Sequence, residues 1–165
     1  KYFASNDINI ISGLALGIDT IAHEESLKSH GKTTGVLIDL KNISPPKNKN
    51  LAKKIIDNGG LLIAENIPGT LPKKYHYTER NRLQAALSKL VFIIEADLDS
   101  GTKTTSDFAM KQGKQIFCPE LNVISNYPDE LYAGSLNKYL LESNNAKPFT
   151  KDLYPKILEM LSNDT

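Results

Sequence analysis

The sequence has few of the residues that support several common kinds of site. Of its 165 residues, one is a cysteine, none is a tryptophan and three are histidines. A single thiol, Cys118, excludes an internal disulfide and a cysteine-based metal cluster, so we expect no metal, no cofactor and a reducing, cytoplasmic setting. No apolar run approaches the length that spans a bilayer, so we expect no membrane partner. The formal net charge is only +1, so affinity for nucleic acid would have to come from local charge.

Short apolar segments alternate regularly with helical patterns along the chain. Five apolar and β-branched runs predict buried strands, at residues 8–11, 33–40, 61–64, 90–94 and 115–118. Helices are predicted between and after them, at residues 18–30, 51–58, 79–88, 102–112, 136–142 and 153–161. This strand–helix rhythm is typical of parallel sheets. We therefore predict an α/β fold with a mostly parallel sheet and helices on both of its faces.

A glycine turn follows the first predicted strand directly. It runs Ser12-Gly-Leu-Ala-Leu-Gly-Ile-Asp19, and the helical pattern begins at Ile18. Gly13 and Gly17 let the backbone turn sharply and leave no Cβ in the way of a ligand. The free N–H groups of the helix start would then face the sheet edge, a geometry that binds phosphate, although tight turns share the pattern. For Asp19 we favour a structural role, binding a basic side chain or capping backbone N–H groups.

The connection after the third predicted strand carries the strongest local charge. Between Thr70 and Arg82, four Lys or Arg residues stand against one Glu, and two tyrosines are interleaved. Cations beside aromatic rings are typical of single-strand nucleic-acid surfaces, although a solvated basic loop has the same composition. We expect a long connection over Glu65–Tyr77 and a helix with Thr78 as its N-cap. Arg80 and Arg82 cannot share one helix face, so one can reach a ligand while the other binds a carboxylate.

The turn after the fourth predicted strand presents hydroxyl groups around a glycine. Ser100, Gly101 and Thr102 precede Lys103, so hydroxyl, backbone and ammonium donors are available to a phosphate. Simple capping of the next helix by Ser100 or Thr102 is the alternative. The spacing differs from that of a P-loop. No Ser-His-Asp arrangement, paired carboxylates or metal-ligand spacing is evident in the sequence, so we predict no catalytic residues.

Taken in order, these motifs resemble the DNA-processing protein A family, also called DprA or Smf. The resemblance covers roughly residues 8–119 and, more loosely, extends to about residue 149. It rests on Ser12–His23, Pro68-Gly69, Lys74–Tyr77, Arg80–Arg82 and Ser100–Thr105. It implies an extended Rossmann-like domain that binds and protects single-stranded DNA and helps load the RecA recombinase in natural transformation. It also implies a homodimer that is not an enzyme.

The resemblance further implies which residues contact DNA. Lys74 stands at the position of the family's principal DNA-contacting lysine, and Tyr77 stands where an aromatic residue packs against a base. The glycine turns and the Arg-Asn-Arg motif complete the set. The expected DNA- or phosphate-binding residues are Ser12, Gly13, Gly17, Lys74, Tyr77, Arg80, Asn81, Arg82, Ser100, Gly101, Thr102 and Lys103.

The chain departs from the family pattern at four places, one of which is Pro119-Glu120, where the family usually has Pro-Gly after the fifth strand. Leu16 stands where the family commonly has Arg or Lys, which removes one phosphate contact. Ile38-Asp39-Leu40-Lys41 replaces a turn that usually reads Gly-x-Gly-Leu-Asp. The family's first strand and its Gly-Ser-Arg turn would lie before Lys1. We therefore expect residues 1–165 to be a single Rossmann-like domain without that strand, either a fragment or a divergent member.

Two other functions share this fold. One is a nucleotide or phosphoribosyl hydrolase of the lysine-decarboxylase-like (LOG) type, which has both glycine turns. Its catalytic glutamate has no counterpart here, because Thr102 is followed by Lys103, Thr104 and Thr105. The other is a nucleotide-sensing module, which would bind a small nucleotide tightly and long DNA poorly.

Overall fold

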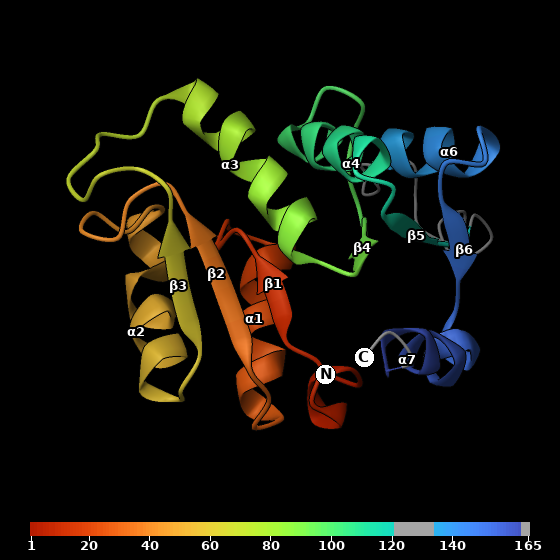
Figure 1. The fold of residues 1–165 in the computed structure, drawn as a ribbon, viewed down its shortest axis with the longest axis horizontal. Helices are drawn as coiled ribbons and strands as arrows, with labels where there is room; N and C mark the ends of the chain where they lie inside the picture. Colours follow the sequence, from red (N-terminus) through yellow and green to blue (C-terminus); the bar gives the residue numbers. More distant parts are fainter. Residues whose placement is uncertain (121–133, 163–165) are drawn as a thin grey trace. The chain divides into compact units, whose positions relative to one another are not determined.

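The computed structural model describes residues 1–120 and 134–162, and the chain forms two compact units, residues 1–84 and 85–165. Each unit holds one sheet of three strands, and every neighbouring pair within them is parallel (Figure 1). This confirms the predicted α/β class and the parallel strands. The strand pattern did not predict the division into two sets of three. The expectation of a single domain that lacks an N-terminal strand stays a prediction.

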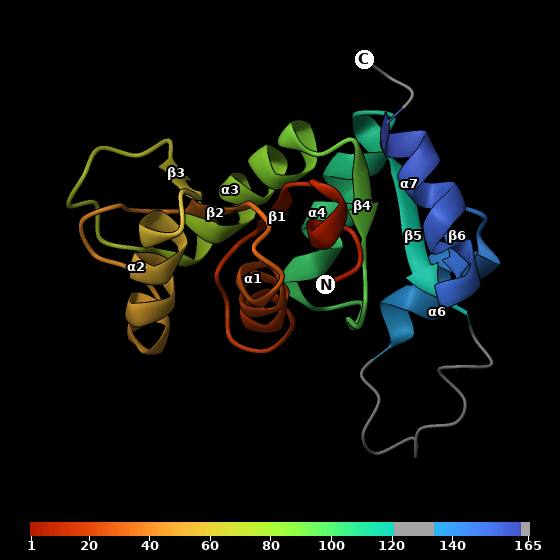
Figure 2. The same cartoon turned by 90° about the horizontal axis from the view of Figure 1, so that it is seen from below.

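The first unit is built on a sheet of order β1-β2-β3. Its strands are β1 (Ile10–Ser12), β2 (Thr33–Leu37) and β3 (Leu61–Ala64), preceded by the 3-10 helix η1 (Ala4–Asn6). Its α-helices are α1 (Ile18–Lys28), α2 (Lys49–Asp57) and α3 (Lys74–Leu87). The 3-10 helix η2 (Pro46–Asn48) leads directly into α2. Figure 2 shows α1 and α2 side by side on one face of this sheet. Because the strands are parallel, their carboxyl ends share one edge, and the connections that leave this edge carry the predicted site.

Burial explains why α1 and α2 pack where they do. Leu51 and Ile55 lie one helical turn apart on α2 and are buried against Leu37 of β2. Leu14 of the glycine turn is fully buried in the same cluster. The turn is therefore anchored in the core of the first unit, and its shape is set by packing as well as by its glycines.

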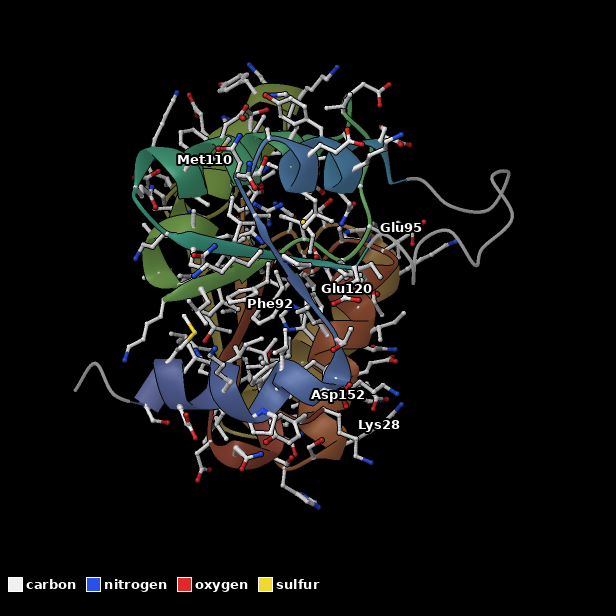
Figure 3. The ribbon with its side chains drawn as sticks, turned by 90° about the vertical axis from the view of Figure 1, so that its right-hand side faces the viewer. Lys28, Phe92, Glu95, Met110, Glu120 and Asp152 are labelled. Carbon is white, nitrogen blue, oxygen red and sulfur yellow. The ribbon has the colours of Figure 1, made fainter. Side chains whose placement is uncertain are left out.

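The second unit has a sheet of order β4-β5-β6. Its elements are β4 (Leu90–Phe92), α4 (Gly101–Lys111), β5 (Gln115–Pro119), α6 (Ser135–Glu142), β6 (Lys147–Phe149), η3 (Lys151–Leu153) and α7 (Tyr154–Ser162). Figure 3 shows Phe92 between this sheet and α7, where its ring packs against Phe117 and Phe149. Leu136 and Leu140 of α6 are fully buried in the core of this unit.

The sequence did not predict β6, for a physical reason. The strand has three residues, one of which is Pro148, and proline has no N–H to donate to a ladder. Such a strand is tolerated at a sheet edge, and β6 pairs with β5 alone within the described residues. None of the described helices is long and apolar enough to cross a membrane.

Candidate nucleic-acid interface

Three of the four basic residues after β3, Lys74, Arg80 and Arg82, lie on a helix. α3 begins at Lys74, so the prediction of an N-cap at Thr78 is wrong. The His76 N–H donates to the Lys73 carbonyl at 3.0 Å, and the Lys73 N–H donates back to Nδ1 of His76 at 3.1 Å. This reciprocal pair does the work of a capping box, with imidazole in place of the usual Glu or Gln. No Ser, Thr, Asp or Asn marks the helix start, which is why the sequence placed it too late.

The start of α3 presents one cation and two aromatic rings to solvent. Lys74 is exposed, and its ammonium group makes no ion pair or hydrogen bond within the part of the chain that the structure describes. Tyr75 is 52 % exposed, and its ring lies 4.1 Å from that of His76, centroid to centroid. Tyr77 is 39 % exposed, and its hydroxyl is 3.0 Å from that of Ser44. Such a surface can neutralise a phosphate and stack on bases.

Arg80 points the other way, to the carboxyl edge of the first sheet. Its Nη1 donates to the Gly13 carbonyl at 2.9 Å and to the Val36 carbonyl, and its Nε donates to Asn81 Oδ1 at 3.2 Å. Burial lowers the pKa of the Arg80 guanidinium, while the nearby Asp19 carboxylate opposes that shift. Arg80 thus fastens α3 to the ends of β1 and β2. Its contact with DNA stays a prediction.

Arg82 diverges from Arg80, as the two-residue spacing predicts. Its Nη2 lies 2.5 Å from Glu65, the residue that follows β3. The arginine that binds a carboxylate is therefore Arg82. Asn81, between the two arginines, is buried. A shallow pocket on the inner side of α3 places Arg80 beside both Glu65 and Glu79. Because Glu65 is also paired with Arg82, the charges around this pocket balance and give no net attraction for a phosphate.

The glycine turn holds a carboxylate of its own. Asp19 Oδ1 accepts a hydrogen bond from the Ser12 hydroxyl at 2.6 Å, and Oδ2 accepts from the N–H groups of Gly13 at 3.1 Å and Ala15 at 3.0 Å. Asp19 therefore caps backbone N–H groups, as favoured from the sequence. Gly17 is the N-cap of α1 with φ at 86°, a conformation that favours glycine. The phosphate-binding roles of Ser12, Gly13 and Gly17 stay predictions.

Asn48 fixes the far side of the glycine turn and was missed by the sequence reasoning. Its Nδ2 donates to the carbonyls of Leu14 at 2.8 Å and Ala15 at 3.2 Å, and to the Thr20 hydroxyl at 2.8 Å. Leu14 has φ at 64°, so its conformation needs this support. A single asparagine after two prolines carries no pattern that would have revealed this role.

Asp39 is a second residue that sequence reasoning did not assign. It is 2 % exposed and accepts hydrogen bonds from the N–H groups of Lys41, Asn42 and Gly69 and from the Asn42 side chain. Burial raises the pKa of Asp39, but the donors from Gly69, Lys41 and Asn42 outweigh it and bring the pKa to about 2. The turn that Asp39 closes also ends β2 at Leu37, although the apolar run continues to Leu40. The sequence did contain one sign of this role, because Ile38-Asp39-Leu40-Lys41 departs from the glycine-containing turn that is usual in the family.

In the second unit, the turn before α4 keeps its donors within the chain. The Ser100 hydroxyl donates to the Asp97 carbonyl at 2.6 Å and does not cap α4. Lys103 Nζ lies 2.8 Å from Asp107 in an i, i+4 ion pair. Gly101, where α4 begins, has open space around an added Cβ. DNA contacts by Ser100, Gly101, Thr102 and Lys103 stay predictions. Among the described residues, no group of three or more His, Cys, Asp or Glu could hold a metal ion.

Comparison with known proteins settles the family. The family model described as DNA recombination-mediator protein A matches residues 1–157. The chain belongs to this family. The match covers both glycine turns and α3, the elements on which the sequence resemblance rested.

Curated members of the DNA recombination-mediator protein A family share about a third of their residues with the chain. DNA processing protein DprA of Streptococcus pneumoniae is 36% identical over 75% of this chain and 44% of its own length. Protein Smf of Escherichia coli is 37% identical over 69% of this chain and 31% of its own length. The chain therefore spans less than half the length of these relatives.

Solved structures of family members have the same fold. DNA processing protein A from Helicobacter pylori, described for its single-stranded DNA binding mode, is 30% identical with a TM-score of 0.79, over 98% of this chain and 69% of that one. DprA from Streptococcus pneumoniae is 32% identical with a TM-score of 0.72, over 90% of this chain and 50% of that one.

Proposed function

We propose that this chain binds single-stranded DNA and that the exposed face at the start of α3 is its central contact. The observation that carries the proposal is the exposed ammonium of Lys74, unpaired among the described residues, beside the exposed ring of Tyr77. A phosphate neutralised by Lys74 would leave its base within reach of that ring, since the bases of a single strand are unpaired and can turn out to stack on an aromatic side chain. The Helicobacter pylori relative, described for its single-stranded DNA binding mode, supports this assignment.

The wider role follows from the family to which the chain belongs. As a recombination mediator it would act in the cytoplasm, as a homodimer and without catalysis, protecting incoming DNA and helping to load RecA during natural transformation. The ion pair between Lys103 and Asp107 argues against the hydrolase alternative, because it occupies the acid nearest to that enzyme's expected glutamate position.

Fluorescence anisotropy of labelled oligo-dT tests the proposal, at several salt concentrations and with three proteins. They are the wild type, Lys74→Glu and the matched control Lys54→Glu on α2. Each phosphate contact contributes about 0.7 to the slope of log K against log salt for single strands. Lys74→Glu should weaken binding at least about tenfold and lower the slope by about that amount. Lys54→Glu makes the same charge change outside the interface and should leave both quantities near the wild-type values.

Two outcomes would favour the alternatives. A wild type that ignores oligo-dT but is stabilised by a nucleoside monophosphate in a thermal-shift screen would be a nucleotide-sensing module. Release of free base from that nucleotide would indicate a hydrolase. Equal losses in Lys74→Glu and Lys54→Glu would show that net charge, and not this face of α3, governs binding.

A further inference from the structure

The segment Ile38–Ser44, which leaves the carboxyl end of β2, is bonded to the connection that leads from β3 into α3. We call this segment the brace. Asn66 Nδ2 donates to the Ile38 carbonyl at 3.1 Å, and the Gly69 N–H donates to Asp39 at 2.9 Å. The hydroxyls of Ser44 and Tyr77 are 3.0 Å apart. The first two bonds fall at the start and the middle of the connection, and the third falls on Tyr77 in the first turn of α3.

The brace is itself a closed turn. The buried carboxylate of Asp39 accepts hydrogen bonds from the Lys41 N–H at 3.0 Å and the Asn42 N–H at 3.1 Å. It also accepts one from the Asn42 side-chain amide at 2.8 Å. Two residues after Asn42, the chain reaches Ser44. The Ser44 hydroxyl is thus carried by a segment that Ile38 and Asp39 bond at its root to the connection between β3 and α3.

Tyr77 is consequently held at two points. Its Cα belongs to α3, which Arg80 bonds to the carbonyls of Gly13 and Val36, and its hydroxyl meets Ser44. A tyrosine side chain has only two rotatable bonds, so two fixed ends set the direction of the ring axis and therefore the place that the ring occupies. The ring is still 39 % exposed, so a base can reach it. Stacking on a ring already held in place loses less conformational freedom than stacking on a mobile one.

We propose that Ser44 is a positioning residue for single-stranded DNA, whose hydroxyl holds the Tyr77 ring ready to stack on a base. The inference rests on the proposed function. In this arrangement the Tyr77 hydroxyl bonds to Ser44, and the face of the ring contacts a base of the DNA. If the hydroxyl bound a phosphate instead, removing Ser44 would release it for that contact and would not weaken binding.

The test measures oligo-dT affinity and its salt slope for the intact chain. The variants are Ser44→Ala, Tyr77→Phe, the double variant and Ser44→Thr, which keeps the hydroxyl. Ser44→Ala and Tyr77→Phe each remove one side of the same bond, so each should weaken binding about two- to tenfold, the range expected when one immobilised side chain regains its freedom. The double variant should be no weaker than either single variant, and Ser44→Thr should bind like the wild type. The salt slope should not change, since no cation is lost.

The matched controls remove hydroxyls elsewhere. Ser29→Ala deletes a serine hydroxyl at the end of α1 that donates to the Glu25 carbonyl at 2.7 Å. Tyr139→Phe removes the hydroxyl group from an exposed tyrosine ring on α6. Neither should change affinity.

Two results would overturn the inference. One is an affinity of Ser44→Ala for oligo-dT equal to that of the wild type. The other is a double variant in which the losses of affinity caused by Ser44→Ala and Tyr77→Phe add together. Both leave the proposed function intact if Lys74→Glu still weakens binding and Lys54→Glu does not. A wild type that does not bind oligo-dT refutes the proposed function itself, and the inference with it.

Discussion

Replacing Gly13 by alanine should break the junction between the glycine turn and α3. An added Cβ would lie 2.5 Å from Nη1 of Arg80 and 2.8 Å from its Cζ and Nη2, distances that real contacts do not reach. The φ of Gly13 is not positive, so alanine can adopt the backbone conformation. The whole effect must therefore come from displacing the guanidinium group.

The size of the effect follows from what Arg80 would lose. Its Nη1 donates to the carbonyls of Gly13 and Val36, and hydrogen bonds from a charged donor contribute about 1.5–3 kcal/mol each. The two bonds share one nitrogen, and a displaced guanidinium regains water. We therefore expect Gly13→Ala to lower the free energy of unfolding by about 2–4 kcal/mol.

Urea unfolding followed by circular dichroism would measure this in a double-mutant cycle. In an Arg80→Ala background no guanidinium is left to collide with, so Gly13→Ala should then have an effect near zero. Gly101→Ala is the control, since no atom lies within 4 Å of a Cβ added there and its φ is not positive. An equal loss in both backgrounds, or no loss in the wild type, would refute the reasoning.

Two further predictions concern buried polar groups. Burial lowers the pKa of His23 to about 4 from 6.5, despite the opposing effect of Asp19, so the folded state binds the proton less well than the unfolded chain does. The contribution of His23 to the free energy of unfolding should be fully present above pH 6.5 and should fall by about 3 kcal/mol in all as the pH drops towards 4. The amide of His23→Asn can replace the Nδ1 contact with Thr33 but does not titrate. In this variant the urea midpoint should therefore change less with pH over that range. In the second unit, Asn137 is fully buried, accepts from the Ala96 N–H and donates to the carbonyls of Ile93 and Ile94, so Asn137→Ala should destabilise the chain by about 3 kcal/mol in urea. A loss below about 1 kcal/mol would contradict the role we assign to Asn137.

The architecture could be predicted from the sequence because it depends on patterns that repeat. Apolar and β-branched runs marked β1 to β5, and helical periodicity marked the helices between and after them. β6 could not be found, since three residues with a central proline carry no strand pattern. The start of α3 was placed too late because His76, which completes its cap, is not a residue that usually marks a helix start.

The site was predictable where neighbours in sequence decide it. The role of Asp19 and the divergence of Arg80 and Arg82 follow from spacing within one turn and one helix. Asp19 also accepts a hydrogen bond from the Ser12 hydroxyl, a contact that its predicted capping of backbone N–H groups did not include. The brace was missed entirely. Its bonds join residues 28 to 33 positions apart, and a single Asp or Ser carries no sign of such a partner.

The brace has a consequence for the order in which the chain folds. Its three bonds join the segments that leave β2 and β3, so they form only after these parallel strands have paired in register. Closing loops of about thirty residues is slow compared with forming a local helix. We expect the face that carries Tyr77 to be among the last parts of the first unit to reach its final shape. In a refolding chain, secondary structure would return first, and affinity for a ligand would lag behind it.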